Sequence, residues 1–192
     1  MEALRVMIAE DEALTRTLLR ARLEKMGHQV VAEAEDGRQA VEMAAIHKPD
    51  LLLMDVSLPE LEGADAAALI NIDNPCAVIF LTDIAEEERV LQAARAGAMA
   101  YLMKPFRKEE LAPALIVAIH RFRQVQCLQK EISDLKEALE SRKIVERAKG
   151  ILMTRHGLTE DEAFKKIHFQ ARNQNKKMRE IAESIITASD LI

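Results

Sequence analysis

The sequence predicts an α/β fold: a doubly wound, five-stranded parallel sheet, followed by a coiled-coil helix and a small all-α three-helix bundle. Three observations predict this fold. Short apolar runs alternate with amphipathic segments five times within residues 1–121. The apolar positions then follow a heptad within residues 122–141, and three short helical patterns fill residues 142–192. We therefore expect three parts with these boundaries.

Five strands are expected, at residues 4–9, 29–34, 51–55, 76–81 and 99–103. A helical pattern follows each strand, beginning after Glu12, at Asp36, and near Ala64, Ala85 and Arg107. This alternation favours a parallel sheet that is covered by helices on both faces. Right-handed crossovers then favour the strand order 2-1-3-4-5.

Individual residues predict where these helices begin and end. Gly27 and Gly97 are expected to end the first and the fourth helix. Asp36 is expected to cap the second helix, because Gln39 follows three residues later. Asp83 is expected to cap the fourth helix in a similar way.

The fifth helical pattern continues into a heptad instead of stopping. Its a and d positions are held by Val125, Leu128, Ile132, Leu135 and Leu139. β-Branched residues at a with leucine at d favour a parallel two-stranded coil. Glu131 and Lys136 have the spacing of an interhelical salt bridge in such a dimer. We expect a homodimer, and the alternative is an amphipathic helix packed on its own domain.

The last 50 residues predict a small helical bundle. Gly157 is placed to end its first helix. Thr159 and Glu162 form a capping box that opens the second helix. A turn at residues 173–175 separates the second helix from the third. A core of this size stabilises a fold by only a few kcal/mol, so attachment to a coiled coil would help it.

Composition predicts a cytoplasmic protein without a membrane anchor. Of the 192 residues, 49% are hydrophobic and 31% are charged, and no apolar run approaches the roughly 20 residues of a membrane helix. The two cysteines are far apart, which suits a reduced compartment. Residues 1–120 carry 12 Lys and Arg against 21 Asp and Glu, whereas residues 121–192 carry 15 against 11. The basic half is therefore a candidate for binding a polyanion.

Charged or polar residues follow several of the expected strands. Glu10 and Asp11 end the first, Asp55 ends the third, Thr82 follows the fourth and Lys104 follows the fifth. The carboxyl ends of parallel strands meet at one edge of a sheet, so three carboxylates converge there. A hard cation with oxygen ligands, most plausibly Mg²⁺, relieves their repulsion. A carboxylate beside Mg²⁺ and lysine can act as a nucleophile toward a phosphoryl group.

With Pro59, Gly63, Tyr101 and Pro105, these residues resemble the receiver domain of bacterial two-component response regulators. The resemblance implies phosphorylation of Asp55 by a histidine kinase. It implies Mg²⁺ held by Asp11, Asp55 and the backbone carbonyl of Ser57, with Glu10 acting mainly through water. Thr82 and Tyr101 would form the conformational switch, and the Lys104–Pro105 bond would be cis. Asp83 departs from the small residue that more often follows the switch threonine.

The C-terminal part carries a second set of candidate residues. Arg147, Ala148, Lys149 and Gly150 are consecutive, and Lys149 is expected to lie away from the apolar face of its helix. Gly150 costs its helix up to about 1 kcal/mol relative to alanine, so close packing or a partner that approaches the backbone is expected there. Arg172 and Lys176 belong to a basic cluster that suits phosphate contacts. Phe169 is a candidate for stacking on an unpaired base, or for partial burial against a neighbouring helix.

These residues, with the runs 157–159, 163–164 and 181–182, resemble the ANTAR domain, an RNA-binding module of transcription antitermination regulators. His168 and Ala171 depart from the arginine and serine that are common in that family.

The resemblance implies a phosphorylation-dependent regulator, not an enzyme, that binds RNA hairpins in a leader transcript and promotes antitermination. Two alternatives remain at this point: a receiver whose helical tail binds a protein, and a DNA-binding regulator.

Overall fold

A computed structural model describes residues 2–83 and 97–190 of the chain. It divides into two compact units, Met1–Gln126 and Cys127–Ile192. The helix expected to begin near Ala85, and with it the capping by Asp83, lies outside the described residues.

The first unit contains the predicted sheet. Its strands are β1 (Arg5–Ala9), β2 (Gln29–Ala34), β3 (Leu51–Asp55), β4 (Ala77–Thr82) and β5 (Ala98–Met103). Each pair of neighbouring strands is parallel, and the strand order is β2-β1-β3-β4-β5. The fold class and the strand order predicted from the sequence are both confirmed.

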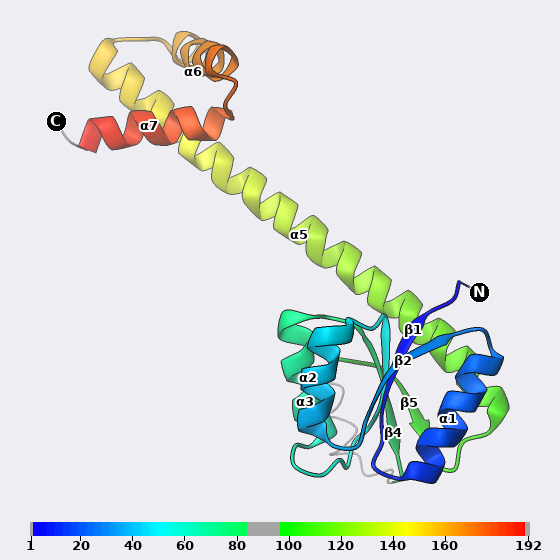
Figure 1. Cartoon of the computed structure of the whole chain (residues 1–192). Coiled ribbons are helices and arrows are strands. Elements are labelled where there is room, and N and C mark those ends of the chain that lie inside the picture. The colour runs from blue at the N-terminus through cyan, green and yellow to red at the C-terminus, as the bar shows by residue number, and fades with distance from the viewer. Residues whose placement is uncertain (1, 84–96, 191–192) are drawn as a thin grey trace. The chain divides into compact units, whose positions relative to one another are not determined.

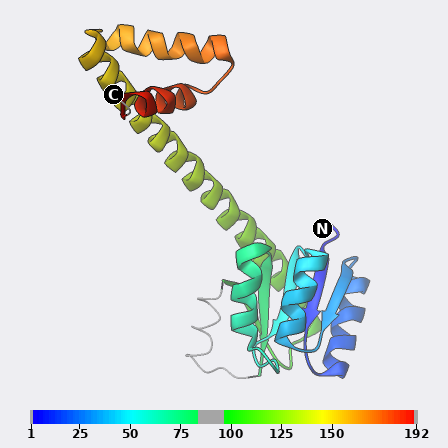
Figure 2. The same cartoon turned by 60° about the vertical axis from the view of Figure 1, so that its left-hand side comes forward.

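Helices cover both faces of this sheet (Figure 1). On one face lie α2 (Gly37–His47) and α3 (Gly63–Asp73), which contribute alanines and Ile70 to one buried cluster. On the other face lie α1 (Ala13–Lys25) and the start of α5 (Lys108–His156), which contribute leucines to a second cluster. The same arrangement is visible after a 60° turn (Figure 2). Strands β3 and β4 are buried along their whole length, as the near-continuous apolar runs predicted.

Several predicted helix ends are found in the structure. Asp36 caps α2, and its side chain accepts a hydrogen bond of 2.8 Å from the backbone N–H of Gln39. Gly27 follows α1 with a φ of +86°, a left-handed conformation that glycine adopts without steric cost. The Lys104–Pro105 peptide bond is cis, as expected.

The helix α5 runs for 49 residues without a break, so it includes the predicted coiled-coil segment and the first helix of the bundle. All five seam residues are exposed, with 39–63% of each residue's surface accessible: Val125, Leu128, Ile132, Leu135 and Leu139. None of them belongs to a buried cluster of the described chain. The seam is thus an apolar stripe that the described part of this chain leaves uncovered.

The second unit packs the end of α5 against α6 (Glu160–Gln174) and α7 (Met178–Asp190). Its core consists of small and aliphatic side chains from all three helices: Ala148, Leu152, Ala163, Ile167, Ala171, Ile181 and Ala182. The capping box of Thr159 and Glu162 forms as predicted. Within residues 2–83 and 97–190, no helix is both long enough and apolar enough to cross a membrane.

Candidate functional site

Three carboxylates meet at the carboxyl edge of the sheet. Glu10 follows β1 and is fully buried, Asp55 ends β3 with 6% exposure, and Asp11 is exposed. One oxygen from each lies within 4.8 Å of the others. The register places these groups together, because β1 and β3 are neighbours and pair Ala9 with Met54. The convergence predicted from the strand ends is therefore observed.

Lys104, one residue beyond β5, joins two of these carboxylates. Its ammonium lies 2.5 Å from Asp55 Oδ2 and 2.8 Å from Glu10 Oε1. Burial acts to lower the pKa of Lys104, but the hydrogen bonds and charges of Asp55 and Glu10 outweigh it and raise that pKa. Lys104 is therefore a fixed positive charge beside Asp55 at neutral pH.

Burial dominates at Glu10. It raises the pKa of this carboxyl group, although Lys104 opposes the shift through a hydrogen bond and its charge. The nearby charge of Asp55 acts in the same direction as burial. A cation bound between these carboxylates would reverse this balance, because it favours their ionised forms.

The loop after β3 fixes the side chain of Asp55. The Ser57 backbone N–H donates a 2.8 Å hydrogen bond to Asp55 Oδ1. The loop returns at Gly63, whose N–H donates to the Val56 carbonyl at 2.9 Å. A Cβ at Gly63 would lie 2.0 Å from the carbonyl oxygen of Asp55, so only glycine fits there. The structure thus gives a steric reason for the Gly63 of the sequence motif.

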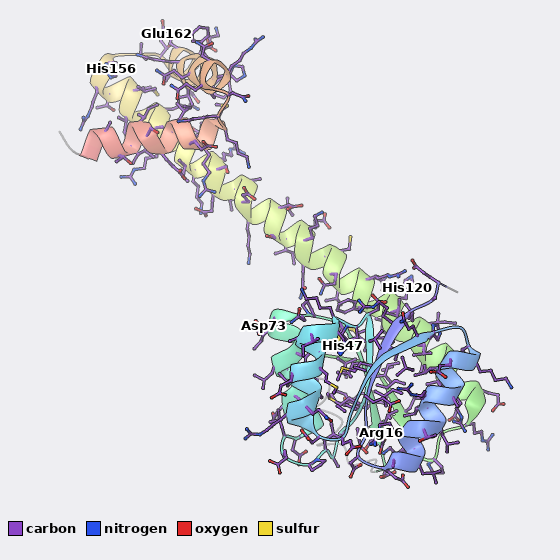
Figure 3. The ribbon with its side chains drawn as sticks, in the orientation of Figure 1. Arg16, His47, Asp73, His120, His156 and Glu162 are labelled. Atoms are coloured by element: carbon purple, nitrogen blue, oxygen red, sulfur yellow. The ribbon has the colours of Figure 1, made fainter. Side chains whose placement is uncertain are left out.

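Arg16 supports the acidic loop and was missed by the sequence analysis. Its guanidinium donates to the Glu10 carbonyl at 2.6 Å and pairs with Glu35 at 2.5 Å. Figure 3 shows Arg16 near the carboxyl edge of the sheet, whereas His47 and His120 lie at the opposite end. Nothing in the local sequence indicates this contact, because it joins α1 to the ends of β1 and β2.

The two predicted switch residues lie on adjacent strands. Thr82 ends β4 with 7% exposure, and its carbonyl accepts a 2.8 Å hydrogen bond from the Lys104 backbone N–H. Tyr101 on β5 is half-buried, with its ring centroid 6.1 Å from that of Phe80. Burial raises the pKa of the Tyr101 hydroxyl. The assignment of a switch to these residues stays a prediction.

The carboxylate cluster fits a divalent cation. All of its side-chain donors are oxygens, the atoms that Mg²⁺ prefers, and the exposed Asp11 leaves one side open for water and a phosphoryl group. Asp11 and Asp55 would hold such an ion directly.

The candidate RNA-binding residues of the second unit differ in their exposure to solvent. Arg147 and Gly150 are exposed on α5, and Arg172 and Lys176 are exposed around the end of α6. Ala148 lies in the core with no exposed surface.

Lys149, which is expected to lie away from the apolar face of its helix, is buried in the structure and largely inaccessible to solvent. Its side chain is only 7% exposed, and its ammonium binds Glu146 and Glu160 at 2.9 and 2.8 Å. These hydrogen bonds raise the pKa of Lys149, with Glu160 contributing most. Glu160 is the first residue of α6, so this ion pair links α6 to α5. This geometry could not be foreseen, because the partner comes from a different helix.

Two family comparisons cover both units. Residues 6–116 match the response regulator receiver domain, and residues 133–186 match the ANTAR domain. The chain belongs to the response regulators that join a receiver domain to an ANTAR domain. Receiver domains take a phosphoryl group from histidine kinases and ANTAR domains bind RNA, so the chain is a response regulator with an RNA-binding output.

Individual relatives agree with this assignment. The chain is 47% identical over 182 residues to the transcriptional regulatory protein PdtaR of Mycobacterium tuberculosis, covering 95% of this chain and 89% of PdtaR. It is 38% identical to the chemotaxis protein CheY of Bacillus subtilis, over 58% of this chain and 93% of CheY. A receiver domain of a modulated diguanylate cyclase from Desulfovibrio desulfuricans superposes with a TM-score of 0.60 at 31% identity, covering 64% of this chain and 98% of that domain.

Proposed function

We propose that this response regulator is switched by phosphorylation of Asp55 and, once switched, binds hairpins in a leader RNA to promote transcription antitermination. The observation that carries the first part is the contact of Lys104 with Asp55 inside a cluster of three carboxylates. The match of the C-terminal unit to the ANTAR domain supports the second part. The protein would act in the cytoplasm as a regulator and not as an enzyme.

The chemistry follows from the groups around Asp55. A carboxylate oxygen of Asp55 attacks the phosphorus of a phosphohistidine on the kinase, the P–N bond breaks, and the imidazole leaves with the electron pair. Asp55 becomes an acyl phosphate. Mg²⁺, held by Asp11, Asp55 and the Ser57 carbonyl, would supply positive charge to the phosphoryl oxygens. Lys104 supplies a second positive charge, since its ammonium already lies 2.5 Å from Asp55.

Thr82 and Tyr101 would transmit the conformational change that follows phosphorylation of Asp55. Thr82 lies at the same sheet edge as Asp55, since β3 and β4 pair Asp55 with Leu81. Its hydroxyl would move toward the phosphoryl group, and Tyr101 would turn inward behind it. The half-buried position of Tyr101 beside Phe80 supports this, because little further movement buries the ring.

The exposed seam of α5 supports a homodimer. Five apolar side chains at a and d spacing stay uncovered in this chain, and a second copy would bury them in a parallel coil. Two ANTAR domains in one dimer would raise the effective concentration at the second of two RNA hairpins.

Phosphorylation is tested with a small phosphodonor and Mg²⁺. Wild-type protein should be labelled, and Asp55→Asn, which keeps the shape of the side chain, should not. Labelling of Asp55→Asn would overturn the assignment of the phosphoryl acceptor.

RNA binding is tested by filter binding of the full chain to an RNA hairpin library and to duplex DNA, with and without beryllium fluoride as an acyl-phosphate mimic. Preference for RNA is expected. Equal or stronger binding to DNA would favour a DNA-binding regulator, and binding to neither would favour a protein partner.

Dimerisation is tested by sedimentation of two variants that carry the same added charge. Leu135→Asp places the charge in the seam and should yield monomers. Ser133→Asp places it outside the seam and should leave the dimer intact. A Leu135→Asp variant that remains dimeric would refute the coiled-coil assignment.

A further inference from the structure

A small pocket lies at the amino-terminal edge of the sheet, between the residues before β1 and the first third of α5. It measures about 200 Å³ and is lined by apolar and charged side chains: Glu2, Leu4, Ile116, Ile119, His120 and Arg123. Leu4 comes directly before β1, so this amino-edge pocket lies at the opposite end of the strands from Asp55. Figure 3 shows His120 at that end, away from Arg16. The pocket is therefore distinct from the carboxylate cluster.

The floor of the amino-edge pocket is apolar and already formed. Leu4 is only 4% exposed and belongs to the buried cluster beneath α1 and α5. Its backbone N–H donates to His28 Nδ1 at 3.2 Å, and its carbonyl accepts from the Gln29 N–H at 2.8 Å. Because both backbone groups of Leu4 are bonded, the floor needs no rearrangement to receive a ligand, as is usual for small-molecule sites.

One face of α5 forms the wall of the pocket. Ile116, His120 and Arg123 are four and three residues apart, so they lie on the same side of the helix. Ile119 packs partly against the buried cluster, whereas Ile116 is 51% exposed and belongs to no cluster. The wall thus presents apolar surface beside an apolar floor, and burying an apolar group between them is favourable.

An ion pair closes one side of the pocket. Arg123 donates to Glu2 at 3.1 Å and so joins α5 to the residues before β1. The two side chains are 64% and 76% exposed, and an ion pair so well hydrated contributes little stability and opens readily. A guanidinium carries five N–H donors in a fixed fork that fits a carboxylate in a bidentate way. Arg123 can therefore exchange Glu2 for a carboxylate from outside the chain, with the His120 ring beside it as a further donor.

We propose that the amino-edge pocket binds a small carboxylate with a compact apolar body. The body lies against Leu4 and Ile116, and the carboxylate binds Arg123 in place of Glu2. The ligand is small, because 200 Å³ equals the volume of about seven water molecules at about 30 Å³ each. Pockets for larger organic ligands measure roughly 300–1,000 Å³. This binding requires neither phosphorylation nor RNA, so it is independent of the proposed function.

The test titrates the full chain with isocaproate and follows the backbone amides by NMR. Isocaproate should shift the amides of Leu4 and of residues 116–123. Isocaproamide removes the charge of the probe and isohexylamine inverts it, and both should bind at least about tenfold more weakly because the charged hydrogen bonds are lost. Acetylglycylleucine carries a similar apolar carboxylate at a peptide end. Tighter binding of this peptide than of isocaproate would identify a chain terminus as the source of the carboxylate, and the reverse would identify a free acid.

Paired variants separate the pocket from the rest of α5. Arg123→Gln should weaken isocaproate binding about tenfold, whereas Arg121→Gln, the same loss of charge outside the pocket, should bind like the wild type. Ile116→Trp should fill the pocket and abolish binding. Val117→Trp adds the same bulk at the next residue, which is 43% exposed and does not line the pocket, and should not. Glu2→Gln should tighten binding by up to about fivefold, because it removes the carboxylate that competes for Arg123.

Each outcome decides the inference. Absence of shifts at Leu4 and residues 116–123 with both carboxylate probes would overturn the site. Equal binding of isocaproate and isohexylamine would show apolar attraction alone and would overturn the choice of a carboxylate. Weaker binding by Glu2→Gln would show that Glu2 builds the site instead of competing for it, which contradicts the exchange at Arg123. If Ile116→Trp does not fold, Arg123→Gln decides, because the Arg123 side chain is 64% exposed and its loss leaves no cavity.

Discussion

Gly150 offers a prediction in which stability and RNA binding change in opposite directions. It lies in the interior of α5, is exposed, and a Cβ built there meets no atom within 4 Å. Close packing within the chain therefore does not explain the glycine. The remaining explanation is a partner that approaches the helix backbone, and RNA is the partner that the proposed function supplies.

The substitution Gly150→Ala should stabilise the ANTAR domain. Alanine is favoured over glycine in a helix interior by about 0.8–1.0 kcal/mol, and no contact in the structure opposes the added methyl group. For a unit of this size, 1 kcal/mol raises the melting temperature by about 4–8 °C. The same methyl group would hold an RNA backbone away from α5. A loss of about 1.4 kcal/mol, or tenfold in Kd, is expected.

Thermal unfolding by circular dichroism and filter binding to the hairpin library would measure both quantities. Ser133→Ala, also exposed on α5, is the control: it should stabilise slightly and bind RNA normally. A Gly150→Ala protein that is more stable and binds RNA like the wild type would refute RNA contact at this backbone. A less stable variant would refute the packing argument itself.

Three further predictions concern the receiver domain. Arg16→Met should lower the affinity for Mg²⁺ at least tenfold, because the lost guanidinium orients the Glu10 carbonyl in the acidic loop. Titration calorimetry would measure this affinity, and an unchanged value would show that Arg16 does not position the loop for the ion. A thiol reagent should modify the exposed Cys127 in the native protein and reach Cys76 only after unfolding. Cys76 is protected because burial shields its thiol and raises its pKa to about 12. Mass spectrometry would follow the labelling, and modification of Cys76 in the native protein would contradict its burial. Burial lowers the pKa of His28 below its ordinary 6.5, so the unfolded chain takes up a proton at a higher pH than the folded chain does. The free energy of unfolding should therefore fall as the pH drops below 6.5, by up to about 1.4 kcal/mol per pH unit. Urea unfolding of wild type and His28→Gln at pH 7.5 and 5.5 would measure this difference, and an equal loss in both proteins would assign it to other groups.

Much of the receiver site could be predicted because its chemistry is local to strand ends. Apolar runs ending at Asp55 and Thr82 predicted buried strands, and the crossover rules placed their carboxyl ends at one edge. The parallel pairing of β1 with β3 then places Glu10 beside Asp55, and Lys104 binds both carboxylates. The helix caps at Asp36 and Thr159 were predictable for the same reason, because a cap depends on residues three positions apart.

Contacts between distant elements could not be predicted in this way. Helical spacing predicted that Lys149 lies away from the apolar face of its helix, yet an ion pair with Glu160 from the next helix holds it in a nearly buried position. Arg16 supports the acidic loop from α1, and Gly63 is required by a carbonyl eight residues earlier in the chain.

The sequence by itself determined the order of strands and helices, the edge at which the carboxylates meet and the heptad of α5. These depend on hydrophobic periodicity and on residues close together in the chain. Only the tertiary structure decided which cations of the ANTAR domain form ion pairs with carboxylates, and with which ones. A side chain's partners depend on the distances between packed helices, which periodicity does not contain. For that reason Lys149 links α6 to α5, whereas neither Arg172 nor Lys176 has a carboxylate partner among the residues that the structure describes.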